Sequence, residues 1–503
     1  MKTKSLLMLT VLAILATVGF TSCDELAVED NPMQSYMTMR TGDVTLKIGD
    51  TYLRKAVAAG TAVVVYSSSD ETVATVDQEG KVTAIAAGTA TITAQTTGYN
   101  AEGKKIYLAE EKSYKVTVYD PVNSLSSPAL LTVAVGNSAT ITPTIDPADY
   151  PIQWSSSDES IATVDETGKV TGVKVSAVPV TITAKAGGKT ATCNVVVVSF
   201  DLSTLTAAYT AHDGDVLTGI TTYPVSIPDG ATIYLAGATI NNTVECLGDA
   251  TVAMVKETVN TISAATTAIK AGPANTTLTL SGEGTLYATS GTICYACIGS
   301  QQQGAAGNIV IKGGIINATA AGFAAAIGAG DGGSCQDITI QGGMVTTHTG
   351  DYGAGIGTGD NYYGATSCRN ITITGGTVNA YGGNYGAGIG AGGAYSNNYA
   401  ITCRDITITG GTVNAYGGNY GAGIGTGIRV YSNGPFPTCG NITISGGTIT
   451  ATKGASAVWD IGPGVYSVAP GTYYGIVFGT ISVTETVTVK DKNGEDAHIY
   501  AAP

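Results

Sequence analysis

The chain has 503 residues, of which 68 are glycine, 27 are tyrosine and only 12% are charged, a length that accommodates about two to four domains. A net charge of −14 offers no basic surface to nucleic acid, so we expect no nucleic-acid partner. A collagen-like chain is excluded because glycine follows no three-residue period, and 44% hydrophobic residues exclude a disordered acidic chain.

The start of the chain has the features of an export signal. Basic residues precede an apolar run over 6–18, which is shorter than the ~20 residues that span a bilayer, and small residues then lead to Cys23. This pattern resembles a bacterial lipoprotein lipobox, although Phe20 stands where leucine is usual. The resemblance implies a signal peptide over 1–22 and acylation of Cys23; the alternative is an ordinary cleaved signal with an incidental cysteine.

An acidic segment over 23–38 follows the cysteine. It resembles the export tag of surface lipoproteins in the Bacteroidetes. The resemblance implies an outer-membrane protein that is exposed at the cell surface and is held in the membrane by its lipid anchor alone.

A segment of about twenty residues occurs twice. Residues 66–77 read Tyr-Ser-Ser-Ser-Asp-Glu-Thr-Val-Ala-Thr-Val-Asp, residues 154–165 read Trp-Ser-Ser-Ser-Asp-Glu-Ser-Ile-Ala-Thr-Val-Asp, and Gly-Lys-Val-Thr follows each copy. The alternating runs around them, bounded by Asp, Gly and Ser, predict two antiparallel β-sandwiches. The signature closely resembles the bacterial Ig-like domain of group 2, which implies such domains over 39–119 and 120–200.

The same resemblance assigns roles to four residues. It implies that Tyr66 and Trp154 pack in the two cores and that Asp70 and Asp158 shape turns. Members of the family serve as spacers and adhesion modules, so the resemblance implies a stalk without enzymatic chemistry.

Composition changes near residue 200, where we predict a domain boundary. Residues 1–200 carry 15 basic and 20 acidic side chains, whereas 201–503 carry 9 and 18 together with 55 of the 68 glycines. The second part repeats the pattern Asn/Asp-Ile-Thr-Ile-x-Gly-Gly, which places isoleucine at 309, 338, 371, 406 and 442. Dense glycine disfavours helices, and repeats of this length with three short strands each predict a stacked solenoid.

The Gly-Ala-Gly-Ile-Gly arrays of this part resemble right-handed, pectin-lyase-like β-helix repeats of bacterial surface proteins. The resulting fold class is all-β: two Ig-like sandwiches followed by a right-handed parallel β-helix over 201–503.

Strand parity separates two aromatic columns of the solenoid. Val378 and Ala380 should point inward, so Tyr381 and the equivalent His348 and Tyr416 should point outward, where they are candidates for ligand contact. A second column contains Phe323, Tyr352, Tyr385 and Tyr420, and we expect it to point inward and to stack.

Three lengthening loops should lie side by side because their coils stack. They contain further candidate ligand-binding residues: Tyr362, Tyr363, Tyr395, Asn397, Tyr399 and Tyr431. Tyrosine faces pack against sugar rings while amides bond to hydroxyl groups, and tyrosine also serves adhesive protein contacts. The alternative is that these residue types make tolerable exposed loops.

Cysteine and acid positions argue against metals and catalysis. Cys335, Cys368, Cys403 and Cys439 occupy one repeat position, where side chains point alike, so we expect stacked thiols in preference to disulfides. Cys294 and Cys297 form a lone pair, and the chain has three histidines, so we expect no metal centre and no cofactor. Asp337 and Asp405 share their column with asparagines, which indicates turn bonding in place of acid–base catalysis.

These observations predict a non-enzymatic surface protein whose β-helix binds a glycan or a host or bacterial surface protein. Two alternatives stay open: a polysaccharide lyase or glycoside hydrolase of the β-helix fold, and a purely structural cell-surface protein.

Overall fold

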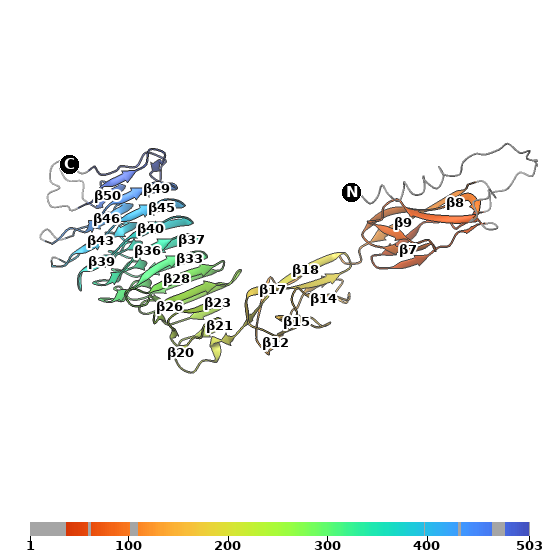
Figure 1. Ribbon diagram of the computed structural model, residues 1–503, viewed down its shortest axis with the longest axis horizontal. Coiled ribbons are helices and arrows are strands. Elements are labelled where there is room, and N and C mark those ends of the chain that lie inside the picture. Colours follow the sequence, from red (N-terminus) through yellow and green to blue (C-terminus); the bar gives the residue numbers. More distant parts are fainter. Residues whose placement is uncertain are drawn as a thin grey trace, which may run out of the picture. The chain divides into compact units, whose positions relative to one another are not determined.

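The computed structural model describes residues 37–58, 62–100, 109–396, 398–430, 434–464 and 478–501 (Figure 1). Apart from one short 3-10 turn, η1 (Leu202–Thr204), the regular elements in these ranges are all β-strands, which confirms the all-β fold class. The chain divides into two compact units between Asn123 and Ser124. In the ranges described, no helix is long and apolar enough to cross a membrane.

The first unit is a β-sandwich. Its strands are β1 (Met37–Thr38), β2 (Val44–Lys47), β3 (Thr51–Leu53), β4 (Val57–Ala58), β5 (Ala62–Ser68), β6 (Ala74–Val76), β7 (Lys81–Ala84), β8 (Gly88–Asn100) and β9 (Glu111–Tyr119). A sheet in the order β2-β9-β8-β5 faces a sheet in the order β3-β7-β6, and Val82, Ile92 and Val116 are fully buried between them.

A second sandwich repeats this plan in the other unit. Its strands are β10 (Ser124–Ser126), β11 (Leu130–Ala134), β12 (Ser138–Thr140), β13 (Thr144–Asp146), β14 (Gln153–Ser156), β15 (Ala162–Val164), β16 (Lys169–Gly172), β17 (Ser176–Ala186) and β18 (Lys189–Val198). The sheets run β11-β18-β17-β14 and β12-β16-β15, and β10 pairs with β13.

The roles expected of the repeated signature are confirmed. Tyr66 is buried and its hydroxyl accepts a 2.6 Å hydrogen bond from Ala56 N, while Trp154 packs partly buried against the second core. Asp70 and Asp158 accept hydrogen bonds from the residue two positions on, as turn residues do. The Ser160 hydroxyl holds the pKa of Asp158 below its usual range.

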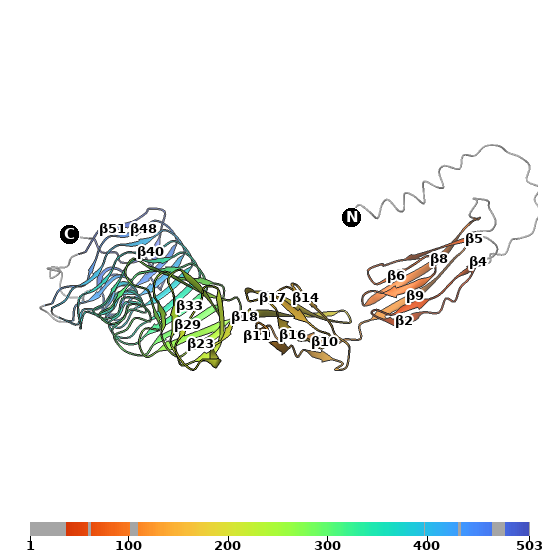
Figure 2. The same cartoon turned by 60° about the horizontal axis from the view of Figure 1, so that its bottom comes forward.

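From residue 200 onward the chain forms a parallel β-helix (Figures 1 and 2). A 19-stranded sheet covers two of its faces, and alternate strands pair in parallel from coil to coil. Its strands are β19 (Phe200–Asp201), β21 (Asp215–Thr221), β23 (Ala231–Ile240), β25 (Ala250–Met254), β26 (Val259–Ala264), β28 (Thr277–Gly282), β29 (Thr285–Ser290), β32 (Asn308–Ile311), β33 (Ile315–Ala320), β36 (Ile338–Ile340), β37 (Met344–His348), β40 (Ile371–Ile373), β41 (Thr377–Tyr381), β44 (Ile406–Ile408), β45 (Thr412–Tyr416), β48 (Ile442–Ile444), β49 (Thr448–Thr452), β51 (Ile481–Val483) and β52 (Val489–Lys490).

Two further parallel sheets complete the coils. One contains β20 (Tyr209–Thr210), β22 (Val225–Ile227), β24 (Val244–Cys246), β27 (Ile269–Lys270), β30 (Ile298–Gly299), β34 (Ile327–Gly328), β38 (Ile356–Gly357), β42 (Ile389–Ala391), β46 (Ile424–Ile428) and β50 (Ile461–Gly464). The other contains β31 (Ala305–Ala306), β35 (Ser334–Cys335), β39 (Thr366–Cys368), β43 (Ile401–Cys403) and β47 (Thr438–Cys439). The sequence predicted three strands per coil, and the short cysteine-containing strand is a fourth.

Residues on both sides of position 200 share a small hydrophobic cluster. Val196 and Val198 of β18 pack with Val216 of β21, Ala236 of β23 and Val255. Beyond this cluster the sandwich and the solenoid keep separate cores, so the change in composition coincides with a change of core.

The repeated isoleucines form the core ladder of the solenoid. Ile309 pairs with Ile338 and Ile338 with Ile371, and the ladder continues through Ile406 and Ile442, all without solvent exposure. The solenoid prediction for the repeats is therefore confirmed.

One glycine column brings neighbouring backbones too close together for any side chain. Gly357 on β38 has φ = +134°, and a Cβ atom there would lie 1.9 Å from the carbonyl oxygen of Gly390 in the next coil. Gly364, in the following loop, would meet nothing nearer than 3.5 Å.

We therefore expect Gly357→Ala to lower the free energy of unfolding of the β-helix by roughly 2–4 kcal/mol, from backbone strain and strand displacement together. Gly364→Ala should change it by less than about 1 kcal/mol. Denaturant unfolding followed by circular dichroism checks this, and equal midpoints for the two variants would contradict it.

Candidate functional site

The outward aromatic column forms a continuous stack, here called the outer ring stack: His348, Tyr381 and Tyr416. These residues pair in register at the ends of β37, β41 and β45. The ring centroids are 4.6 and 4.8 Å apart with interplanar angles of 11° and 13°. His348 is exposed and the two tyrosines are half-buried, while Val378 and Ala380 point into the core, as strand parity predicted.

Stacking changes what this column can offer a ligand. Each ring face inside the stack is covered by the neighbouring ring, so the stack presents ring edges and phenolic hydroxyl groups to solvent. The terminal faces adjoin Thr319 and Thr452, which are the register partners of His348 and Tyr416. The expected packing of sugar rings on this column is thus restricted to its ends.

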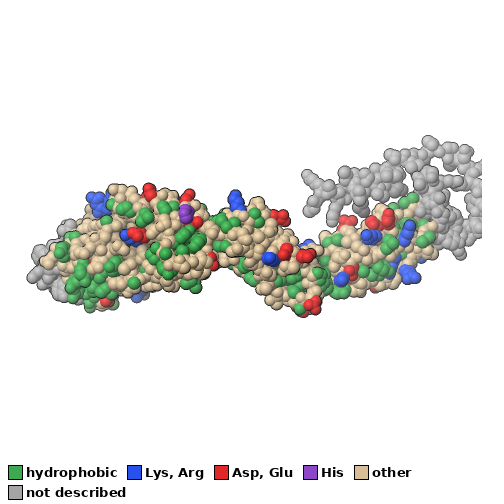
Figure 3. Space-filling view, turned by 90° about the horizontal axis from the view of Figure 1, so that it is seen from below, with side chains coloured by type: hydrophobic (Ala, Val, Ile, Leu, Met, Phe, Trp, Pro, Cys, Tyr) green, Lys and Arg blue, Asp and Glu red, His purple; other side chains and the backbone are tan. Residues whose placement is uncertain are grey.

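An amide row runs beside the outer ring stack on the same strands. Asn414 Nδ2 donates to Asn379 Oδ1 at 2.8 Å, and Asn379 Nδ2 donates to Thr346 Oγ1 at 3.5 Å. Hydroxyl groups and amides therefore line one face of the solenoid in parallel rows. Figure 3 shows one side of the molecule, on which charged side chains are sparse over the β-helix.

The three tyrosines of the second column stack as expected, but only Tyr352 is buried, so the predicted inward direction holds for that residue alone; we call the column the inner ring stack. Tyr352 and Tyr385 stack at 4.5 Å, Tyr385 and Tyr420 stack at 5.2 Å, and Phe323 meets Tyr352 edge-on at 5.0 Å. Tyr352 is buried and the others are half-buried. Burial raises the pKa of Tyr352 well above its ordinary value.

The loops carry a second group of rings, the loop tyrosine patch: Tyr362, Tyr363, Tyr395 and Tyr399. The first three are in ring contact, and Tyr399 is tied to the same loops through its backbone oxygen, which accepts from Asn361. Tyr362 meets Tyr363 edge-to-face at 4.8 Å and lies 5.5 Å from Tyr395. Tyr362, Tyr363 and Tyr399 remain 48%, 45% and 42% exposed. The predicted site residues Cys23, Asn397 and Tyr431 lie outside the described residues.

Tyr395 differs from the other three members of the patch. It is half-buried and packs against Phe323 at 6.2 Å and Tyr352 at 5.3 Å. Tyr395 therefore joins the patch to the inner ring stack and is less available to a ligand than the sequence suggested.

Buried polar groups beneath the patch fix the loops. Asn361 is fully buried: its Oδ1 accepts from Ser396 N at 2.8 Å and its Nδ2 donates to Ser396 O and Tyr399 O. Asp360 Oδ1 accepts from Tyr395 N at 2.8 Å. One loop thus holds the next through two side chains, and the exposed rings sit on an ordered support.

Two fully buried carboxyl groups, Asp331 and Asp360, were missed by the sequence reasoning. Each stands four residues after an isoleucine that is followed by glycine (Ile327 and Ile356), a repeated offset that is visible in the sequence. Burial raises the pKa of Asp360 to about 7 and also raises that of Asp331. Because neither residue is exposed, neither reaches a bound polysaccharide.

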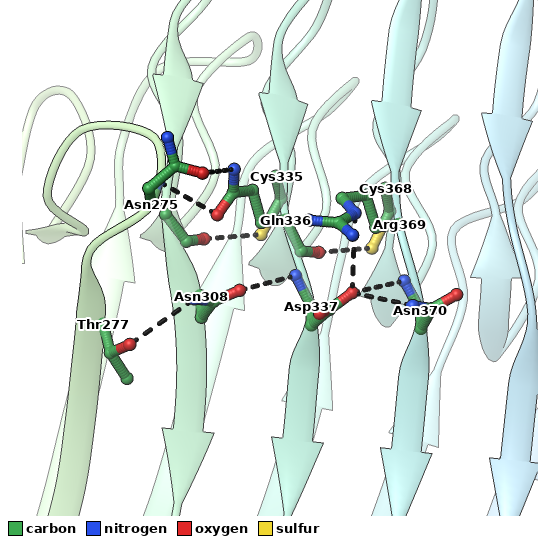
Figure 4. Close-up of polar contacts among 10 residues, drawn as sticks. Asn275, Thr277, Asn308, Cys335, Gln336, Asp337, Cys368, Arg369 and Asn370 are labelled. Atoms are coloured by element: carbon green, nitrogen blue, oxygen red, sulfur yellow. Dashed lines mark hydrogen bonds and ion pairs between the residues drawn. The ribbon is translucent and has the colours of Figure 1, made fainter.

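The half-buried Asp/Asn column at the surface bonds as expected (Figure 4). Asp337 N donates to Asn308 Oδ1 at 3.2 Å, and Asp337 Oδ1 accepts from Asn370 N at 3.1 Å. The ladder continues from Asp405 to Asn441 at 2.7 Å. Figure 4 shows Asn308, Asp337 and Asn370 linking successive coils. Asp405 bonds to the next coil in the same way, so both aspartates serve turn bonding.

The cysteines of the solenoid are free and buried. Cys335, Cys368, Cys403 and Cys439 are in-register neighbours, and the thiol of Cys368 donates to Gln336 O at 3.6 Å. Cys294 and Cys297 are also free. In the part of the chain that the structure describes, no group of three or more His, Cys, Asp or Glu side chains is placed to hold a metal ion.

Two family models match segments of the chain. Residues 38–105 and 123–195 match the family model of the bacterial Ig-like domain (group 2), and residues 338–360, 371–393, 406–428 and 442–464 match that of the beta helix repeat. Both matches confirm the families that the sequence resembled.

Individual relatives cover small parts of the chain. Two uncharacterized proteins of Clostridium acetobutylicum are 33% identical over 139 residues and 37% identical over 95 residues; these segments cover 27% and 16% of this chain and 14% and 24% of those proteins. Among solved structures, domains 1–6 of the surface layer protein SbsC are 21% identical to the matched segment, with a TM-score of 0.14. The match covers 30% of this chain and 22% of that chain. Hemolin, an insect immune protein, is 18% identical to the matched segment, with a TM-score of 0.15. The match covers 35% of this chain and 49% of that chain.

We expect the buried thiols to resist alkylation by iodoacetamide in the native protein. Burial raises the pKa of Cys246 and of Cys297 to about 12, so little thiolate forms at neutral pH, and neither sulfur is accessible. Peptide mass spectrometry should find these cysteines labelled only after unfolding in guanidinium. Native labelling of Cys368, or a disulfide within the ladder, would contradict the stacked-thiol structure.

Proposed function

We propose that this chain, with two bacterial Ig-like domains followed by β-helix repeats, is a cell-surface protein that binds uncharged glycans through its loop tyrosine patch. The observation that carries the proposal is the exposure of Tyr362, Tyr363 and Tyr399 on loops that Asn361 fixes from below. Exposed aromatic rings on a rigid support bind with little loss of conformational entropy.

The charge of the surface favours a neutral ligand. Residues 201–503 carry only 9 basic side chains, against 18 acidic ones. An acidic polysaccharide would require basic partners for its carboxylates or sulfates. Tyrosine faces, phenolic hydroxyl groups and the Asn379/Asn414 row match the apolar faces and hydroxyl groups of a neutral sugar chain.

The two sandwiches fit the role of a spacer between membrane and ligand. Their repeated signature residues are used in cores and turns, which supports a ligand-binding surface on the solenoid. A lipid on Cys23 would anchor such a molecule to the outer membrane and leave the β-helix available to partners outside the cell.

We expect Tyr362→Ala combined with Tyr363→Ala to weaken binding to neutral glycans about tenfold, because each lost ring contact is worth roughly 0.5–1.5 kcal/mol. A glycan array followed by titration calorimetry on the best ligand measures this. Tyr287→Ala, which removes a tyrosine of 48% exposure elsewhere on the solenoid, is the matched control and should leave affinity unchanged.

Two further outcomes of the same assay are informative. The double variant Tyr381→Ala with Tyr416→Ala removes the phenolic hydroxyl groups and ring edges of the outer ring stack. Weaker glycan binding by this variant would show that the ligand extends onto that face. Undiminished binding by the Tyr362/Tyr363 variant would refute the patch, and release of new reducing ends from the glycan would show an enzyme in place of a binding protein.

We expect incorporation of radiolabelled palmitate into the exported protein to be lost on Cys23→Ala, because acylation needs the cysteine sulfur and amino group. Total protein should still be detected by immunoblotting, as a control for expression. Labelling that survives the substitution would exclude a lipid anchor at Cys23.

A further inference from the structure

The positions of Asp331 and Asp360 do not require an acidic residue. In four successive coils, the residue four positions after the isoleucine of the Ile-Gly strand donates its backbone N–H to a carbonyl oxygen one coil before. The four bonds are Asp331 N to Cys294 O (3.0 Å), Asp360 N to Phe323 O (2.6 Å), Gly393 N to Tyr352 O (2.7 Å) and Ile428 N to Tyr385 O (3.0 Å). The fold therefore accepts glycine or isoleucine where two coils carry aspartate.

One oxygen of each carboxyl group has a structural partner and the other has none. Asp331 Oδ1 accepts from Tyr363 N at 3.1 Å, and Asp360 Oδ1 accepts from Tyr395 N at 2.8 Å. Neither Oδ2 atom has a nitrogen or oxygen hydrogen-bond partner, and both residues are fully buried. Burial raises the pKa of the Asp331 carboxyl group, and the Cys294 thiol beside it lowers that pKa. Among the described residues, no lysine, arginine or histidine forms an ion pair with either.

The Asp/Asn ladder at the surface shows how the same chain treats carboxylates elsewhere (Figure 4). Asp337 lies between Asn308 and Asn370, and the Arg369 Nε atom is 3.9 Å from its Oδ1. Asp405 likewise lies between asparagines, so that ladder never places two carboxylates in neighbouring coils. Asp331 and Asp360 break this alternation in the interior, where charge is least well solvated.

The two acids lie in adjacent coils. Ile327 and Ile356, four residues before them, are register partners, and Gly332 N donates to Asp360 O at 3.2 Å. Buried carboxylates are found paired with a positive group or coordinated to a metal, because an isolated buried charge is far too costly. A single divalent ion between them would neutralise both charges and satisfy both orphaned oxygens.

We propose that Asp331 and Asp360 bind one hard divalent cation, of the calcium and magnesium class, through their Oδ2 atoms. Two carboxylate oxygens select hard cations, and calcium readily completes its shell with backbone carbonyl groups and water. The ion would fix the carboxylates whose Oδ1 atoms hold Tyr363 and Tyr395, and so would brace the loop tyrosine patch. This inference goes beyond glycan binding and stands whether or not a glycan binds.

The test uses the purified full-length chain, dialysed against metal-free buffer with and without 5 mM CaCl₂, a concentration about fivefold or more above the ~10⁻⁴–10⁻³ M affinities of extracellular calcium modules. Metal analysis after brief desalting should find about one calcium per chain. The melting temperature of the β-helix transition should rise by at least about 2 °C relative to an EDTA-treated sample. A parallel series with MgCl₂ establishes which ion the site prefers.

The double variant Asp331→Asn with Asp360→Asn distinguishes cation binding from the structural role of the two side chains. Asparagine keeps the Oδ1 acceptor for the backbone N–H and removes the negative charge. This variant should lose both the bound calcium and the calcium-dependent shift in melting temperature. Asp405→Asn is the matched control: asparagine is the native residue at the same place in neighbouring coils, so the variant should retain both. If the double variant fails to fold, each single variant should still lose the bound ion.

Calcium and magnesium contents near zero in the wild-type chain, with no shift in melting temperature, would overturn the proposal and indicate protonated carboxyl groups. Equal metal content in the wild type and the double variant would overturn it as well. Neither result bears on the glycan array, so failure of the cation site and failure of the tyrosine patch are distinguishable.

Discussion

In-register stacking of the coils is the constraint on which the rest of the β-helix depends. Each side chain on a stacked strand meets the side chain at the same position of the coils above and below, so a column tolerates only groups that are compatible with their neighbours. Isoleucine, thiol and aromatic columns satisfy this condition because like neighbours attract or are neutral. Carboxylates do not, and the alternation of Asp337 and Asp405 with asparagine is the solution on the surface.

The same constraint determines the chemistry of the aromatic columns. Rings one coil apart stack on each other, so His348, Tyr381 and Tyr416 cover the faces that a sugar would otherwise use. Loop residues are free of this register, because insertions of different length set their positions. Tyr362 and Tyr363 meet at right angles and stay about half exposed, which makes the irregular part of each coil the better surface for recognition.

Sequence periodicity predicted the regular part of the molecule well. Period-two parity and repeat alignment predict four features: the repeated isoleucines, the two aromatic columns, the thiol ladder and the Asp/Asn turns. Each is a local property of one coil that recurs at the same position in the next coil. The burial of Asp360 and Asn361 was not predictable in this way. It arises because the Tyr395 loop of the next coil covers them, and loop-over-loop packing leaves no periodic trace. The fourth strand escaped notice for a related reason, since two or three residues beside a cysteine carry too little pattern.

Residues 371–390 and 406–425 are identical at all twenty positions. In a solenoid whose coils contact only their neighbours, an identical coil brings its own matching interfaces with it. Unequal recombination within the gene can therefore add or delete coils whose strands find matching neighbours, while the loops, which differ from coil to coil, must repack. The number of coils can then change in one heritable step, while the terminal coils and the sandwiches stay as they are. The number of rings in the outer ring stack would change with it. The glycine column that forbids side chains at Gly357 and Gly390 is what keeps every such duplicate interchangeable.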